Sequence, residues 1–252
     1  MQWTDWPFII SQVLTQFSIG AFIILGGIML TGKLCFGQSD RVLKTLPIIW
    51  VLLIIAMLLR EGTLMFGGVN SVSSFGLETF FALSFIILTI TYWFCEKQLV
   101  GSDKWRKLFL IIIVVWGGCY FIDGVLAHAV QLQVVVQFIL AVLLGGALLA
   151  HSMLVKAEHK LTALNRVLPL CGAVLALIAV IANINGIGEL VQQAEQGAIA
   201  GFILRAVSIG SLLIAVGLWL MPLVTKSKPV AAMMFLSTTV MSLASITAAL
   251  SM

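Results

Sequence analysis

Arg60 and Glu61 stand side by side at the end of a long apolar run, and this pair of opposite charges suits proton chemistry. A guanidinium donates hydrogen bonds and stabilises negative charge on a substrate oxygen, whereas a carboxylate accepts a proton as a general base. Polar groups within apolar runs are costly, so each is a candidate for a functional role. We predict Arg60 and Glu61 as the catalytic residues. The candidate substrate-binding residues are Gln16, Glu78, His128 and Arg205.

The elements that must position these residues are membrane helices. Hydrophobic residues make up 61% of the 252 residues and charged residues only 10%, with a mean hydropathy of +1.15. Soluble domains are about 45–50% apolar and about 25% charged. The apolar runs are continuous rather than alternating, which favours helices over a membrane barrel. We expect an all-α, polytopic helix bundle that forms a single integral membrane domain over residues 1–252, surrounded by lipid and without a nucleic-acid partner.

Eight segments are apolar enough to cross a bilayer, whose core of about 30 Å needs about 20 helical residues. They are residues 7–31, 45–60, 77–95, 107–126, 130–154, 167–186, 197–224 and 229–251. The second is short and is expected to end at Arg60. Pro169 is expected in the first turn of its segment, so that no proline interrupts a span. Glycine pairs at 26–27 and 145–146 favour close packing between helices.

Basic residues are unevenly divided between the two ends of these segments. Twelve of the 14 Lys and Arg residues fall in the connections after the first, third, fifth and seventh segments, and only Arg60 and Arg205 do not. Positively charged connections remain in the cytoplasm. We therefore expect both termini on the outer side of the membrane, together with Glu61, Glu78 and Asp123.

Amide and hydroxyl side chains gather in the outer halves of the predicted spans, whereas the cytoplasmic halves are mostly aliphatic. In the first segment, three hydroxyl residues share one face at helical spacing. The set comprises Ser11, Gln12, Thr15, Gln16, Ser18, Gln133, Gln137, Asn183, Asn185 and Arg205. This distribution predicts a polar cavity inside the outer half of the bundle.

Each of these features also has a structural explanation. Gln, Ser and Thr side chains often link neighbouring membrane helices through hydrogen bonds of about 1 kcal/mol. Arg205 could snorkel to the outer membrane surface. Arg60 and Glu61 could mark only the end of a helix. His151 could face the cytoplasmic interface, and His128, close to Asp123, could have a structural role.

A haem or a metal ion is not expected in this chain. A b-type haem between helices needs two histidines at matching depth. His128 lies at the outer edge of the predicted spans, His151 at the inner edge, and His159 in a connection. The four cysteines are scattered, without the clustered thiolates of an iron–sulfur or zinc site. Redox chemistry in the membrane would therefore depend on a diffusible quinone.

Several short motifs resemble the membrane anchor subunits of bacterial dimethyl sulfoxide reductases. The stretch WPFIISQVLTQFSIGAFIIL resembles the first helix of that family, with Trp6-Pro7, Gln16, Gly20 and Phe22-Ile23 at matching positions. Further similarity lies in LLGGALLA (143–150), RVLP (166–169) and LWLMPL (218–223). Eight helices with both termini outside also match the family, so the resemblance extends over nearly the whole chain.

The resemblance implies a role in respiration rather than an independent enzyme. Such a subunit anchors a molybdopterin catalytic subunit and an iron–sulfur subunit to the outer face of the inner membrane. It oxidises menaquinol, a diffusible substrate, and passes the electrons to the iron–sulfur subunit. The subunit itself carries no haem or metal. On this reading, Gln16, Glu78, His128 and Arg205 would bind the quinol.

Two departures from the family leave alternatives open. The family commonly has a histidine just after the second helix, where this chain has Arg60 and Glu61, and its last helix carries charges that residues 229–251 lack. Either the quinol site is altered, or the chain is a passive anchor or assembly subunit in which Arg60 and Glu61 bind the partner. A small transporter is a third possibility, but we find no internal repeat and no acidic residue near the middle of a span.

Overall fold

The computed structural model describes residues 6–32, 34–66, 76–99, 103–158, 161, 163–185 and 187–251, and within these ranges the chain is helical, without a β-strand. The helices are α1 (Trp6–Leu30), α2 (Phe36–Leu43), α3 (Pro47–Phe66), α4 (Leu77–Leu99), α5 (Asp103–Ala127), α6 (Leu132–Leu140), the π-helical turn η3 (Ala141–Gly145), α7 (Gly146–Lys156), α8 (Leu164–Ile184), α9 (Ile187–Glu195), α10 (Ile199–Val224) and α11 (Ala231–Leu250). Eight spans in the described chain are long and apolar enough to cross a membrane, as the sequence predicted.

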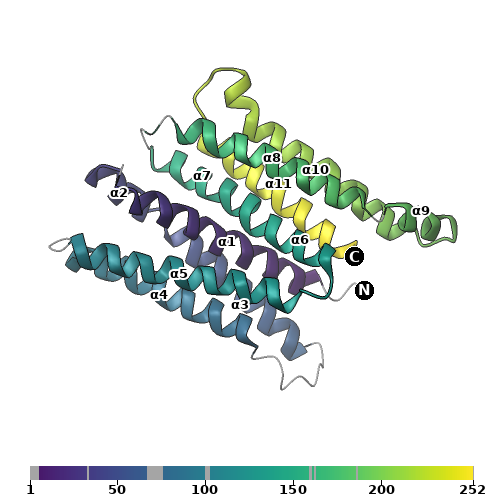
Figure 1. Cartoon of the computed structure of the whole chain (residues 1–252), viewed down its shortest axis with the longest axis horizontal. Coiled ribbons are helices and arrows are strands. Elements are labelled where there is room, and N and C mark those ends of the chain that lie inside the picture. The colour runs from purple at the N-terminus through teal and green to yellow at the C-terminus, as the bar shows by residue number, and fades with distance from the viewer. Residues whose placement is uncertain are drawn as a thin grey trace.

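The helices form one elongated bundle in which α1 is central. Helices α3, α4 and α5 lie on one side of α1, and α6, α7, α8, α10 and α11 lie on the other (Figure 1). Helix α1 packs against α3 and α5 and also against η3, α7 and α11. It therefore joins the two groups of helices, and residues on its different faces can contribute to two separate sites.

The two ends of the bundle carry opposite charges. One, the acidic end, carries Glu61, Glu78, Asp123, Glu189 and Glu195; α1 begins and α11 finishes there (Figure 1). The other, the basic end, carries Arg41, Lys44, Lys104, Arg106, Lys107, Lys156, Arg166, Lys226 and Lys228. The placement of the acidic end in the periplasm remains a prediction from this asymmetry.

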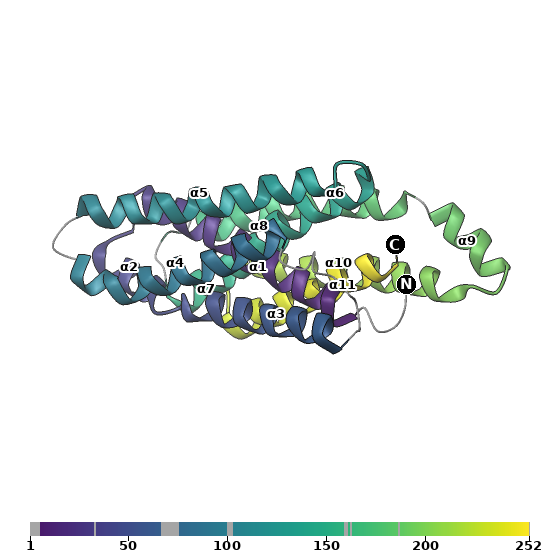
Figure 2. The ribbon, with the colours of Figure 1, turned by 90° about the horizontal axis from the view of Figure 1, so that it is seen from below.

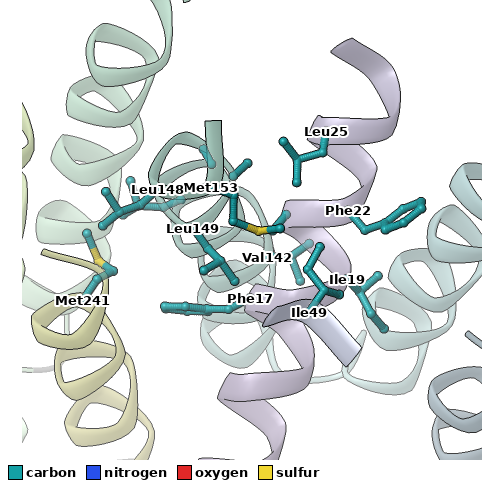
Figure 3. Packing of buried hydrophobic residues seen from close by; sticks show 14 of the residues in the cluster. Phe17, Ile19, Phe22, Leu25, Ile49, Val142, Leu148, Leu149, Met153 and Met241 are labelled. Atoms are coloured by element: carbon teal, nitrogen blue, oxygen red, sulfur yellow. The ribbon is translucent and has the colours of Figure 1, made fainter. Parts of the chain in front are cut away.

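The core follows α1 along its length. Phe17, Phe22 and Leu25 of α1 are at most 2% exposed, and in Figure 3 they meet Ile49 of α3, Leu148 and Leu149 of α7 and Met241 of α11. Many large side chains on the outer faces of the helices are exposed instead. An apolar exposed surface is expected where lipid replaces water around the bundle.

Helix α1 and the turn η3 approach each other so closely that only glycine fits between them. A Cβ atom on Gly20 would collide with the backbone carbonyl of Val142, and one on Gly146 would collide with the backbone of Gly20. Small residues allow membrane helices to approach in this way. The predicted packing role is confirmed for Gly26, Gly145 and Gly146, whose added Cβ atoms would meet side chains or backbone, but it is wrong for Gly27, which has nothing within 4 Å.

Two predicted helix boundaries are wrong, and two short helices were not predicted. Helix α3 does not end at Arg60; it continues to Phe66, so Arg60 and Glu61 lie within the helix. Pro169 lies inside α8 rather than in its first turn, because α8 begins earlier, at Leu164. The short helices α2 and α9 were not predicted. None of the residues of α9 is buried, and the helix projects beyond the others at the acidic end (Figure 2).

His151 does not face the cytoplasmic interface, since it is only 1% exposed. Trp219 Nε1 donates a hydrogen bond to His151 Nδ1 at 2.7 Å, so the imidazole proton is on Nε2. Nε2 lies 3.1 Å from Asn165 Oδ1 and donates to it. The three side chains tie α7, α8 and α10 together near the basic end. His151 and Trp219 are buried there.

Replacing Trp219 with Phe is expected to lower the stability of the bundle. The change removes the donor to a buried imidazole nitrogen, and an unsatisfied buried polar atom costs about 1–3 kcal/mol. The thermal midpoint of unfolding in detergent should fall. Trp105→Phe is the matched control, because Trp105 is 61% exposed, and its midpoint should stay close to that of the unchanged protein. Equal midpoints for the two variants would contradict a structural role of the His151–Trp219 bond.

Candidate functional site

Polar side chains at the acidic half of the bundle form two distinct groups. The first, the ion-pair cluster, consists of Arg60 and Glu61 of α3, Glu78 of α4 and Tyr120 of α5. The second, the amide cavity, is a space of about 340 Å³ lined by residues of α1, α6, η3, α8, α10 and α11. The sequence suggested a single site, whereas the structure separates its residues into two.

In the ion-pair cluster, Glu78 is held from both sides. Arg60 Nη2 lies 3.9 Å from Glu78 Oε2, and the Tyr120 hydroxyl donates to Glu78 Oε1 at 3.5 Å. The guanidinium of Arg60 also lies over the ring of Phe8, 6.0 Å from its centroid. These contacts draw α1, α3, α4 and α5 together. They place one cation and one anion where the side chains are largely shielded from solvent, with 14% and 34% exposure.

Glu61 has a different environment from Glu78. Its Oε1 atom is buried and has no hydrogen-bond partner among the described residues. Arg60 Nε is likewise buried without a partner in the described chain. A carboxylate oxygen without a donor and a guanidinium N–H without an acceptor are complementary to a ligand that supplies a hydroxyl group. This pair of unsatisfied atoms is the strongest feature of the ion-pair cluster.

The amide cavity is neutral and partly polar. Its described lining includes no charged residue; most of it is aliphatic, with the ring of Phe138 on one wall. The polar lining residues are Gln12, Gln16, Gln131, Gln137, Asn183, Ser208 and Ser245. The predicted polar cavity is therefore present in the acidic half, but without the ionisable residues that were expected in it.

The amide of Gln137 is the clearest unsatisfied group of the cavity. Its Nε2 atom is buried and has no hydrogen-bond partner within the described ranges. Gln16, which is 9% exposed, belongs to the same lining. The hydroxyls of Ser11 and Thr15 bond instead to carbonyls of their own helix, at 2.6 and 2.8 Å. The explanation that these hydroxyls link neighbouring helices is therefore wrong for the first segment.

Arg205 lies behind the cavity wall rather than at the membrane surface. It is 3% exposed, so the snorkelling explanation is wrong. Its Nη1 donates to Asn183 Oδ1 at 2.9 Å, and Asn183 Nδ2 donates to the carbonyl of Ala179 at 2.8 Å. Asn183 lines the cavity, whereas Arg205 does not. The arginine fixes the orientation of Asn183 and places a positive charge behind that wall of the cavity.

Phe138 separates the two groups. Its ring lines the cavity, and on its other side it lies 6.0 Å from the ring of Tyr120 and 6.1 Å from the imidazole of His128. His128 therefore lies outside the cavity, in contact with its wall. The π-helical turn η3 follows directly after α6 and contributes Ala141, Leu144 and Gly145 to the lining. Such turns are frequent at functional sites.

Of the predicted site residues, Arg60 and Glu78 are brought together, and Glu61 is next to Arg60. Gln16 belongs to the amide cavity, Arg205 supports it, and His128 contacts the ring of Phe138. Tyr120 and Phe138 were missed, although each is an aromatic residue in the acidic half of a span. No cluster of three or more His, Cys, Asp or Glu side chains occurs within the described ranges; His159 lies outside them.

Comparison with known proteins gives a consistent result over the length of the sequence. A family model described as "DMSO reductase anchor subunit (DmsC)" matches residues 1–249. The C subunit of the anaerobic dimethyl sulfoxide reductase of Escherichia coli K12 is 27% identical over an alignment of 248 positions, and the alignment covers 87% of this protein and 84% of that subunit. No solved structure matches this sequence.

Proposed function

Because this chain belongs to the family of dimethyl sulfoxide reductase anchor subunits, a multi-pass group of the bacterial inner membrane, we propose that it oxidises menaquinol and passes the electrons to an iron–sulfur partner subunit. Its role as a membrane anchor follows from the family. The quinol chemistry is supported by one observation above the others: Glu61 Oε1 and Arg60 Nε are both buried without a partner in the described chain, side by side on α3.

The ion-pair cluster is the proposed place of oxidation. Arg60, held by Glu78 at 3.9 Å, donates a hydrogen bond to a quinol oxygen and stabilises the negative charge that develops there. Glu61 Oε1 accepts the proton of that hydroxyl as a general base. Glu78 and Tyr120 are positioning residues, because they hold the guanidinium. The described cavity lining contains no carboxylate and no histidine, so it lacks a comparable proton acceptor.

The reaction balances in electrons and protons. Oxidation of menaquinol to menaquinone breaks two O–H bonds and releases two electrons and two protons. The electrons pass to the clusters of the iron–sulfur partner, which are reduced. Each proton passes to Glu61 and then leaves to water at the acidic end, where Asp123 and Glu189 also lie. The carboxylate is thereby regenerated for the next turnover.

The partners are proposed to dock at the acidic end. By the asymmetry of basic residues, this end faces the periplasm. The iron–sulfur subunit would lie against it and carry the molybdopterin catalytic subunit. Helix α9, which projects there with no buried side chain, offers contact surface beyond the membrane boundary (Figure 2). Menaquinol reaches the ion-pair cluster from the lipid, so electrons have only to cross the outer part of the bundle.

Replacing Arg60 with Gln tests the proposal directly. The variant keeps a hydrogen-bond donor but loses the charge that stabilises the developing oxyanion, so menaquinol-dependent turnover of the purified complex should fall about 10²-fold or more. Arg166→Gln, at the basic end, is the matched control and should leave turnover unchanged. A complex that assembles fully but never shows quinol-dependent reduction, even without the substitution, would instead identify the protein as a passive anchor.

A further inference from the structure

We propose that the amide cavity is a second binding site, separate from the ion-pair cluster, for the neutral ring of a quinone. The proposal goes beyond menaquinol oxidation at Arg60 and Glu61 and does not depend on it. It rests on the buried, unpartnered Nε2 of Gln137, on Gln16 in the same lining, on the neutral and mostly apolar character of that lining, and on its volume. The site would hold its ligand without oxidising it.

Two amides of the lining define what the ligand must offer. Gln16 comes from α1 and Gln137 from α6, so they approach the cavity from different helices. Gln137 Nε2 is buried without a partner, and leaving such a donor unpaired is unfavourable. The cost is removed when a ligand oxygen accepts a hydrogen bond. A ring with carbonyl oxygens at two positions satisfies both donors, which is the arrangement that a quinone provides.

Two other polar groups of the cavity already have partners. Asn183 is bonded to Arg205 and to Ala179, and the Ser208 hydroxyl donates to the carbonyl of Ala244 at 2.9 Å. These side chains are structural parts of the wall. Of the remaining polar lining residues, Gln16 is buried and Gln137 carries the buried, unpartnered Nε2, so we assign recognition to these two. The aliphatic lining and the ring of Phe138 cover the apolar faces of the ligand.

The lining excludes other membrane ligands. A phospholipid headgroup carries a phosphate, which is normally bound by cationic side chains, and no charged residue of the described chain lines the cavity. A bare acyl tail would gain nothing from two buried amides. The volume of about 340 Å³ is at the lower end of the usual range of about 300–1,000 Å³ for ligand pockets. It suits one ring system rather than a large cofactor.

The same lining explains why this site would not oxidise a quinol. A quinol must lose protons, and the described cavity wall contains no carboxylate or imidazole that could accept them. Phe138 lines the cavity and contacts the ring of Tyr120, with 6.0 Å between the ring centroids, whereas Tyr120 and Glu78 are not part of the lining. The cavity therefore favours the oxidised, carbonyl-bearing form, which needs only donors.

The test counts bound ligand on the purified complex with its partners in mild detergent. The probe is menadione, a naphthoquinone without a tail. The unchanged complex should bind two molecules. Gln16→Leu and Gln137→Leu should each weaken one of these sites at least tenfold, because each removes a donor at constant shape. Gln193→Leu, on the exposed surface of α9, is the matched control and should retain both sites.

A second variant guards against an indirect effect of removing an amide. Ser245→Phe places a ring in the cavity from α11 and leaves Gln16 and Gln137 intact. It should therefore also reduce the number of bound menadione molecules by one. Unaltered binding in all three cavity variants would overturn the proposal. So would a phospholipid retained in the complex and lost only from these variants, as mass spectrometry of the intact complex would detect.

Turnover measurements keep the two sites distinct. If Glu61→Gln abolishes menaquinol oxidation while the cavity variants retain it, both assignments are supported. If Gln16→Leu abolishes oxidation and Glu61→Gln does not, the cavity is the site of oxidation. That result would overturn the non-oxidising second site as well as the role of the ion-pair cluster. Loss of one menadione together with normal turnover is the expected combination for Gln16→Leu.

Discussion

Glu61→Gln is expected to lower menaquinol-dependent turnover by about 10²–10⁴-fold, the usual contribution of a positioned general base. The amide keeps the shape of the side chain but cannot accept the proton of the quinol hydroxyl. Because Glu61 Oε1 has no hydrogen-bond partner among the described residues, the substitution removes no structural contact of that atom. The complex should assemble normally, and the loss should be in kcat rather than in the amount of complex recovered from the membrane.

Glu158→Gln is the matched control for this experiment. The side chain of Glu158 is 80% exposed beside Arg41 at the basic end, far from the proposed site and docking surface, so its loss of charge should leave kcat unchanged. The assay measures the reduction of the terminal acceptor by the purified complex with a soluble menaquinol analogue. A Glu61→Gln complex with normal kcat would contradict the role of Glu61 and shift attention to Glu78, the other carboxylate of the cluster.

Gly20→Ala is expected to prevent or severely weaken assembly of the bundle. The added methyl group would collide with the backbone carbonyl of Val142, and Gly146 Cα would be 3.2 Å away. Backbone atoms cannot rotate out of the way, so α1 and η3 must separate. Overpacking of this kind costs about 1–3 kcal/mol, and here it falls on the helix that joins the two groups. The yield of folded protein and its thermal midpoint are the measurements.

Gly27→Ala lies on the same helix and should have the opposite effect. Its Cβ would have nothing within 4 Å, and Ala is favoured over Gly in a helix by about 0.8–1 kcal/mol. The control variant should therefore be as stable as the unchanged protein or slightly more stable. If both substitutions lowered the midpoint equally, helix flexibility rather than the α1–η3 contact would be the explanation.

Eight spans could be predicted because apolar length alone identifies a membrane helix. The ends of the helices were harder to predict than their number. Arg60 was taken as a terminus because a charge normally leaves the bilayer, but α3 continues to Phe66 while Glu78 neutralises the guanidinium from α4. That pairing joins residues from two helices, and nothing in the local sequence indicates it. Helix α9 was missed because its nine residues are too few, and include too many polar side chains, to give the signal of an apolar span.

The division of the polar residues into two sites could not be predicted from the sequence, for a related reason. Hydropathy gives the depth of a residue in the membrane, and Gln16, Glu78 and Arg205 were all placed correctly in the half of the bundle that carries the acidic residues. It does not give the direction in which each side chain points around its helix. In water that direction follows from an apolar face, but here both the core and the lipid are apolar. Only packing places Gln16 and Gln137 on one cavity and Arg60 beside Glu78.

The π-helical turn at Ala141–Gly145 has a consequence for how the fifth span tolerates change. A wider turn holds an additional residue, and each residue of a regular helix advances about 100° around the axis. The wider turn therefore absorbs its extra residue locally, and the segments on either side keep the faces that an uninterrupted helix would give Gln137 and Gly146. Loss of one residue at this turn would leave Gln137 directed as before. It would instead disturb the contact of Val142 with Gly20, and so the junction between the fifth span and α1.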